Sequence, residues 1–167
     1  NCYGITGDLV FPDSVTKIGY YAFYNCYGFN GNLTLPANLT TMEGRVFSGC
    51  SGITGEIVMP SGITAIGSGV FSGMSKGESL VLSENVIDIY TYYTDSDHPF
   101  YGMNSLKEIT FLGTTVPTID RYTPFPNLKA LETVYVPAEA YEAYAAAYKT
   151  HLPANARMRI IGADDDF

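Results

Sequence analysis

The sequence predicts a β-rich solenoid, a right-handed stack of about six coils of roughly 24 residues each, closed at its C-terminal end by a helix. Three observations lead to this fold class. One residue pattern recurs with a fixed period, short alternations of hydrophobic and polar residues recur with the same period, and an alanine-rich stretch without that pattern follows near the C-terminus.

Three kinds of residue recur every 24 positions along the first half of the chain. Three residue types on one period are not expected by chance, so the period marks a structural repeat of the length found in leucine-rich repeats. A single coil has too little core to be stable alone and must bury its faces against its neighbours. The recurring residues are Cys2, Cys26 and Cys50; Pro12, Pro36 and Pro60; and Phe23, Phe47 and Phe71.

Each of the first three coils contains one segment with the period-two alternation of a half-buried strand. These segments are residues 8–11, 32–35 and 56–59, and each is followed directly by a proline. Proline cannot donate the next hydrogen bond of a β-ladder, so the strand ends there. We expect one short strand per coil, followed by a turn.

The later coils keep the hydrophobic positions but not the full pattern. Residues 80–83 replace the strand-and-proline block, and about five extra residues fall within positions 90–99. Insertions in solenoids usually form loops on one face. The last two coils begin at Met103 and Phe125, and the pattern ends at Pro137.

The chain changes character after Pro137. Residues 138–152 are alanine-rich and place Tyr141, Tyr144 and Tyr148 on one helical face, and Pro153 stops this helix. A strand at 158–161 and an acidic tail at 164–166 follow. We therefore divide the chain into a solenoid, residues 1–137 with an insert at 90–99, and a C-terminal cap, residues 138–167, that covers the end of the stack.

The first three coils resemble the BspA-like leucine-rich repeat family. The resemblance lies in the block from Pro12 through Ile18 and Phe23 to Cys26 and in its equivalent from Pro60 onward. The string Val134-Tyr135-Val136-Pro137 is similar to an ending common in that family. Gly44-Arg45-Val46 departs from the pattern because it lacks the alanine before phenylalanine, and the last three coils lack the cysteine. The resemblance implies an exported surface protein of host-associated bacteria, in a family linked to adhesion to host proteins and to other cells.

The charge balance excludes several classes of partner. The net charge is −8 and the pI is about 4.5, so the chain offers no basic surface for nucleic acid or for an anionic membrane. No stretch reaches the roughly 18 consecutive apolar residues of a membrane span, and no signal peptide stands at the start of this sequence. We expect a monomer at the cell surface or outside the cell, with no part inserted in a membrane.

The sequence predicts no catalytic residue, no cofactor and no metal site. The three cysteines stack in successive coils and favour buried free thiols, with disulfides as the open alternative because stacked Cα atoms lie within disulfide range. His98 and His151, the only histidines, lie in no catalytic motif, and we expect both at the surface. Asp95-Ser96-Asp97 lacks the glycine and glutamate of a calcium loop, which favours a solvated turn.

Tyrosines are the most conspicuous candidates for a binding site, because amphipathic aromatic residues are enriched where proteins meet partners. The chain has fourteen tyrosines, several of them in and beside the insert. The outward face of the strands adds a polar, mildly acidic strip of the kind that solenoids use for recognition. The candidate partner-binding residues are Tyr90, Tyr92, Tyr93 and Tyr101 at the insert, and Glu56, Val58, Glu108 and Tyr135 on the strip.

Two functions are consistent with these residues. The first is a non-catalytic module for binding or adhesion to host proteins or neighbouring cells. The alternative is a structural spacer that displays other domains away from the cell surface. An enzyme is not predicted, because function lies in sites rather than in folds and no chemical constellation is visible. An exposed cluster of Tyr90, Tyr92 and Tyr93 on one face would favour binding.

Overall fold

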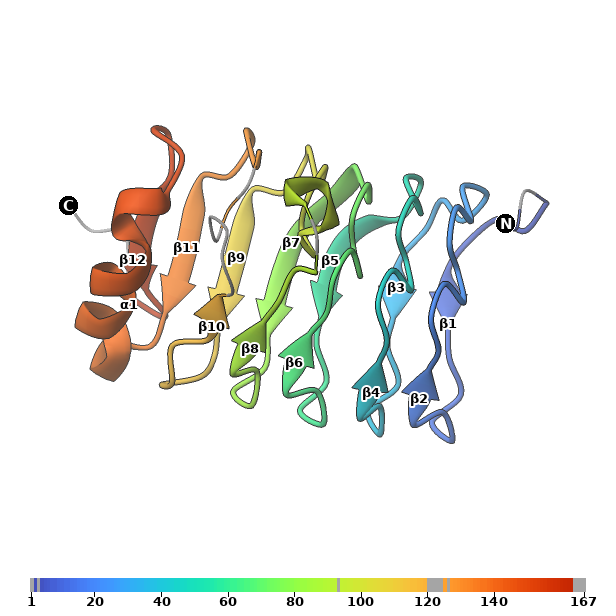
Figure 1. Ribbon diagram of the computed structural model, residues 1–167, viewed down its shortest axis with the longest axis horizontal. Coiled ribbons are helices and arrows are strands. Elements are labelled where there is room, and N and C mark those ends of the chain that lie inside the picture. The colour runs from blue at the N-terminus through green and yellow to red at the C-terminus, as the bar shows by residue number, and fades with distance from the viewer. Residues whose placement is uncertain (1, 3, 93, 120–124, 126, 164–167) are drawn as a thin grey trace.

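The computed structural model, which describes residues 2, 4–92, 94–119, 125 and 127–163, is a solenoid of stacked coils with parallel strands (Figure 1). Five strands form one hydrogen-bonded sheet in the order β12-β11-β9-β7-β5, and β1 pairs with β3 at the N-terminal end. All of these pairings are parallel. The strands are β1 (Leu9–Val10), β3 (Leu33–Thr34), β5 (Thr54–Val58), β7 (Lys76–Leu82), β9 (Glu108–Phe111), β11 (Thr133–Val136) and β12 (Arg157–Ile160).

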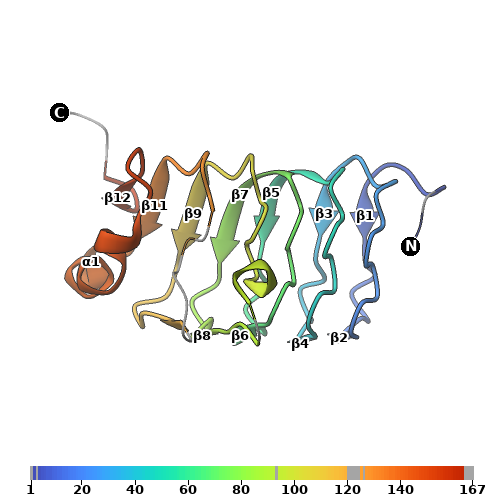
Figure 2. The ribbon, with the colours of Figure 1, turned by 45° about the horizontal axis from the view of Figure 1, so that its top comes forward.

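A second row of strands lies along another side of the stack, so the prediction of one strand per coil is wrong for the first five coils (Figure 2). These strands are two residues long, too short to show an alternating pattern in the sequence. They also pair in parallel, β2 with β4, and β6 with β8 and β10. Their bounds are β2 (Lys17–Ile18), β4 (Thr41–Met42), β6 (Ala65–Ile66), β8 (Asp88–Ile89) and β10 (Thr118–Ile119).

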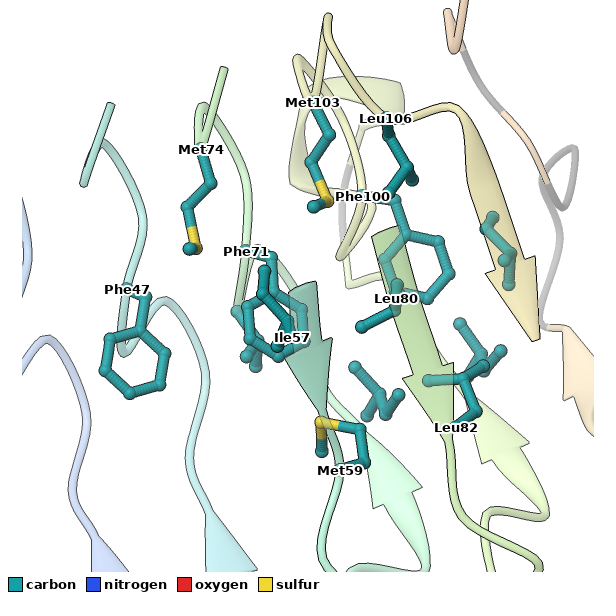
Figure 3. Packing of buried hydrophobic residues seen from close by; sticks show 14 of the residues in the cluster. Phe47, Ile57, Met59, Phe71, Met74, Leu80, Leu82, Phe100, Met103 and Leu106 are labelled. Carbon is teal, nitrogen blue, oxygen red and sulfur yellow. The ribbon is translucent and has the colours of Figure 1, made fainter. Parts of the chain in front are cut away.

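The core runs the length of the stack as ladders of equivalent side chains. The ring of Phe47 stacks between Phe23, at 5.6 Å between centroids, and Phe71, at 6.1 Å. Figure 3 shows Phe47 and Phe71 in one such ladder and Met74 and Met103 in another. Phe47 and Phe71 are fully buried. Each coil therefore buries its hydrophobic surface against its neighbours, as the period predicts.

Glycines at recurring positions allow the coils to approach closely. A Cβ on Gly28 would lie 2.2 Å from the carbonyl oxygen of Ile5, and a Cβ on Gly52 would lie 2.2 Å from that of Phe29. Real Cβ atoms do not come that close to backbone, so these positions need glycine for contact between coils.

The insert lies where the hydrogen bonding between coils changes its offset. The amide of Phe47 donates to the carbonyl of Val70, 23 positions on, whereas the amide of Phe71 donates to the carbonyl of Pro99, 28 positions on. The pairing of Ile66 with Ile89 still has the shorter offset. The five added residues therefore lie after Ile89, and a short 3-10 helix, η1 (Asp95–Asp97), closes the insert.

The C-terminal helix is shorter than residues 138–152. It consists of a 3-10 turn η2 (Ala138–Ala140), the α-helix α1 (Tyr141–Tyr148) and a second 3-10 turn η3 (Lys149–His151). Tyr144 and Tyr148 are buried and donate hydrogen bonds from their hydroxyls to the carbonyls of Gly113 and Pro117. These bonds fasten the helix to the coil that begins at Met103.

The last strand begins one residue earlier than residues 158–161 and continues the sheet. β12 pairs with β11 in parallel, with Met158 opposite Val134, which is the repeat offset of 24. The helix thus occupies the part of a coil that would otherwise return to the sheet. Figure 1 shows α1 at the C-terminal end of the stack. The acidic tail lies outside the described residues.

Candidate functional site

The outward face of the sheet carries two parallel rows of side chains, which we call the strand strip. Register places Glu56, Ser79 and Glu108 in one row. It places Val58 and Tyr135 in the neighbouring row, with Val81 and Thr110 between them. The four strip residues predicted from sequence therefore share one face. Val58 is 49% exposed and Tyr135 is half-buried.

A shallow hollow of about 380 Å³ lies on this strip between β3 and β5. Its lining includes Asn32, Thr34, Glu56 and Val58. These two strands are neighbours in the stack but belong to different hydrogen-bonded sheets. The hollow thus lies where the sheet is interrupted, and its polar and β-branched side chains offer contact area without a reactive group.

The insert forms a second and more enclosed feature, which we call the tyrosine slot. It is a pocket of about 110 Å³. It brings together residues of four coils, since Tyr20 and Tyr21 come from the first, Gly44 and Arg45 from the second, Ser68 from the third and Tyr92 from the insert of the fourth. The slot is lined by Tyr20, Tyr21, Gly44, Arg45, Ser68 and Tyr92.

The slot arises from an irregularity at one repeat position. Tyr20, Gly44 and Ser68 are equivalent residues of successive coils, with a large side chain first and small ones after it. The ring of Tyr20 leans over Gly44, since a Cβ there would lie 3.4 Å from the Tyr20 Cε1 atom. On the opposite side of the slot the insert contacts the third coil, where the backbone amide of Tyr92 donates a hydrogen bond to the Ser68 hydroxyl at 3.4 Å. The small residues form the floor of the slot and the tyrosines its walls.

Tyr90 supports the wall that Tyr92 provides. The two rings meet edge to face, with centroids 5.3 Å apart. The hydroxyl of Tyr90 lies against Gly67, where a Cβ would come within 2.9 Å of it. Burial, and next the hydrogen bond with Tyr92, raises the pKa of Tyr90 to about 12. Tyr90 is thus neutral and half-buried, while Tyr92 is 53% exposed.

The charged groups around the slot are already paired. The Arg45 guanidinium forms an ion pair with Asp97, whose side chain is 6% exposed. Lys17 lies 2.8 Å from the Glu43 carboxylate. A hydrogen bond to Glu43 raises the pKa of the Tyr20 hydroxyl. The Arg45–Asp97 pair also anchors the insert, together with the Ser68 hydroxyl, which donates to the Asp97 carbonyl at 3.0 Å.

Of the predicted insert residues, the structure brings Tyr90 and Tyr92 together. Tyr93 lies outside the described residues, and Tyr101 is half-buried and does not line the slot. Sequence reasoning did not single out Tyr20, Gly44 or Ser68 as site residues. The signal that could have found them is the change from large to small at that repeat position.

Two expectations about the insert are wrong. His98 is buried rather than at the surface, packs edge to face against Phe100 at 5.3 Å and accepts a hydrogen bond on Nδ1 from the Phe100 amide. Burial lowers its pKa to about 4. Asp97 is buried in the ion pair with Arg45 rather than solvated, because the insert folds back on coil two. His151 is exposed as expected.

The three cysteines are free thiols in the stack. Cys26 and Cys50 are buried, and the Cys50 thiol donates to the carbonyl of Phe23 at 2.9 Å. Burial raises the pKa of Cys50 to about 12. Among the described residues, no three histidine, cysteine or acidic side chains are grouped so that they could hold a metal ion.

Within the described part of the chain, no helix has the length and apolar character needed to cross a bilayer. Comparison with known proteins gives a family match, in which the model of the BspA-type leucine-rich repeat region, described as six copies of the repeat, matches residues 1–97. The matched segment holds the first coils and the insert, and the stack continues beyond it. The match covers more than half of the chain.

One solved structure that the comparison matches to this chain is a leucine-rich repeat protein from Bacteroides ovatus ATCC 8483. It is 18% identical to this chain, with a TM-score of 0.33 over 81% of this chain and 56% of that one. This chain therefore spans little more than half the length of that protein. No curated protein matches the sequence.

Proposed function

Because this chain belongs to the BspA-type leucine-rich repeat family, we propose that it is a non-catalytic protein-binding module that serves in adhesion at the bacterial cell surface. Its partners are host matrix or plasma proteins or proteins of neighbouring cells, and it binds them as a monomer outside the cell. Repeat solenoids generally recognise partners with extended surfaces built from many coils.

The observation that carries this proposal is the tyrosine slot. Tyr20, Tyr21 and Tyr92 are each more than half exposed, although aromatic rings gain free energy by burial. They converge from the first coil and from the insert of the fourth on one small pocket. Tyrosines at the centre of interfaces supply much of the binding energy, because the ring is large and the hydroxyl can hydrogen-bond.

The strand strip supports the same proposal as a second contact area. Val58 and Val10 are exposed apolar residues among polar ones, and Glu56 and Glu108 give the strip negative charge. Protein interfaces combine apolar contacts with a polar rim in this manner. The same rows end in Arg157 and Arg159 on β12, so the strip offers negative charge at β5 and β9 and positive charge at its C-terminal end for complementary groups of a partner.

The alternative is a structural spacer that holds another domain away from the cell. The continuous ladder of Phe23, Phe47 and Phe71 favours it, because such stacking makes the solenoid stiff. A spacer has no reason to keep exposed tyrosines grouped around a pocket, which is why we prefer the binding function.

Solid-phase binding to a panel of purified extracellular-matrix and plasma proteins at physiological salt tests the proposal. Two variants remove one surface each, Tyr92→Ser at the slot and Val58→Lys on the strip. Tyr27→Ser is the matched control, because Tyr27 is also exposed but lies outside both surfaces.

We expect saturable binding to at least one panel protein, weakened at least tenfold by a slot or strip variant and unchanged in the control. If all three variants retain binding, neither the tyrosine slot nor the strand strip is the binding site. The absence of binding to every panel protein would overturn the adhesion proposal and favour the spacer.

A further inference from the structure

We infer that the tyrosine slot holds a proline ring from an extended, proline-rich segment of a protein partner, with basic residues beside the prolines. This inference deepens the proposed function, on which it rests, by giving the chemistry of the partner. Three observations support it: the size of the slot, its aromatic walls, and the pairing of the polar groups in and beside it.

The size of the slot favours one side chain over a free small molecule. Its volume is about 110 Å³, whereas pockets for small molecules usually measure about 300–1,000 Å³. A partner side chain of ring size fills it while the rest of the partner stays outside. Anchoring by a single side chain in a small pocket is common at protein interfaces.

The walls and the floor favour a ring that lies between aromatic faces. Tyr20 and Tyr92 stand on opposite sides of the small residues Gly44 and Ser68. Grooves lined by aromatic side chains are the general means of binding proline-rich segments in the polyproline II conformation. Such segments lose little conformational entropy on binding, because proline already restricts the backbone.

The polar groups in and beside the slot favour a partner group that needs few hydrogen bonds. The Ser68 hydroxyl donates to the Asp97 carbonyl and accepts from the Tyr92 amide. Arg45 is paired with Asp97, and Glu43 with Lys17. A sugar inserted here would exchange its hydrogen bonds with water for few new ones, which costs free energy. A proline ring has no hydrogen-bond donor, so it loses no hydrogen bond with water when it enters the slot.

The charges of this chain indicate which residues of the partner flank the proline. The paired groups leave the slot itself without an unbalanced charge, so a lysine or arginine side chain has no counter-charge inside it. The whole chain, however, carries a net charge of −8. Long-range attraction therefore favours basic residues on the parts of the partner that remain in solvent. The partner segment is thus neutral at its anchor and positive at its flanks.

Three synthetic peptides test the inference by isothermal titration calorimetry with the full chain. The first has ten prolines with two lysines at each end, the second replaces the lysines by glutamates, and the third replaces the prolines by alternating glycine and alanine. We expect the lysine-flanked proline peptide to bind at least tenfold more tightly than either of the others. Raising the salt concentration should reduce its advantage over the glutamate peptide, because salt screens the flanking charges.

Two variants locate the binding. Tyr92→Ala removes a wall, and Gly44→Leu fills the slot, where an added Cβ would lie 3.3 Å from the Ser68 carbonyl oxygen. Each should weaken the first peptide at least tenfold, while Tyr27→Ala leaves it unchanged. Circular dichroism and melting temperature show whether Gly44→Leu folds, and Tyr92→Ala keeps the test valid if it does not, because Tyr92 is exposed.

Equal binding of the proline and glycine-alanine peptides, binding unchanged in Tyr92→Ala, or no binding of any peptide would overturn the inference. A panel of neutral oligosaccharides serves as the competing chemistry, and its binding with the same loss in Tyr92→Ala would also overturn it. These failures differ from failure of the proposed function. A panel protein that binds through the slot while the proline peptide does not leaves the adhesion proposal standing.

Discussion

The rings of Phe47 and Phe71 lie parallel, with an interplanar angle of 4° and centroids 6.1 Å apart, although they belong to different coils. Both rings are completely buried. Phe23 extends the stack on the other side of Phe47, so Phe47 contacts a ring in the coil before it and another in the coil after it. Its removal affects three coils at once.

We therefore expect Phe47→Ala to lower the free energy of unfolding by about 3–5 kcal/mol, because a buried aromatic side chain is lost and a cavity remains. Urea denaturation followed by circular dichroism measures the change. Ile5→Ala, which shortens a side chain that is 52% exposed, should change stability by less than about 0.5 kcal/mol. An unchanged melting temperature for Phe47→Ala would show that the core ladder is wrongly placed.

His98 makes stability depend on pH between about 4 and 6.5. Burial lowers the pKa of His98 from 6.5 to about 4 in the folded protein. As the pH falls through this range, the unfolded chain takes up a proton that the folded protein does not. The contribution of neutral His98 is therefore fully present above pH 6.5 and is lost as the pH falls towards 4, by about 3 kcal/mol in total.

Urea denaturation at pH 4.5 and 7.5 checks this sign against His98→Asn. The Asn side chain keeps an oxygen near Nδ1 that accepts from the Phe100 amide but has no proton to gain. The fall in stability between the two pH values should be smaller in the variant. An equal fall in both proteins would mean that His98 does not cause it.

The buried thiols should resist alkylation while the protein is folded. Cys26 and Cys50 are inaccessible, burial raises the pKa of both, and the thiolate is the reactive form. Iodoacetamide at pH 8 should add at most one label, on half-buried Cys2, and three labels after unfolding in urea. Intact-mass analysis counts them. A mass lower by two hydrogens before treatment would reveal a disulfide and contradict the free thiols.

The Tyr144 hydroxyl should contribute to the stability of the capping helix. The Tyr144 hydroxyl donates to the carbonyls of Gly113 and Thr115, at 2.9 and 3.2 Å, in a buried position. Tyr144→Phe leaves these acceptors without the donor, and we expect a loss of about 1–3 kcal/mol. Tyr21→Phe is the control, with no loss expected, because Tyr21 is 53% exposed and phenylalanine keeps its ring contact with Tyr24. Hydrogen exchange of the α1 amides should become faster in Tyr144→Phe, and unchanged protection would show that the hydroxyl does not hold the helix.

Much of the fold is predictable from sequence because the residues that recur along the chain are those that face the core. Phe23, Phe47 and Phe71 share a period because each coil repeats the same inward contact, and the prolines mark where each strand ends. The second row of strands was missed, since segments as short as Lys17–Ile18 give no alternation. The helix was located but overextended, because 3-10 turns flank α1 and composition does not separate the two helix types.

For the candidate site too, some features are predictable from the sequence and others appear only in the structure. The sequence by itself determined the stack, the strand strip, the place of the insert and the excess of tyrosine, because each follows from residues near one another in the chain or one period apart. Only the tertiary structure decided that the insert folds back, buries His98 and pairs Asp97 with Arg45, and that Tyr92 meets Tyr20 across Gly44 and Ser68. The physical reason is that the path of the insert depends on contacts between coils that no local pattern encodes, whereas the repeat depends on one contact that every coil makes again.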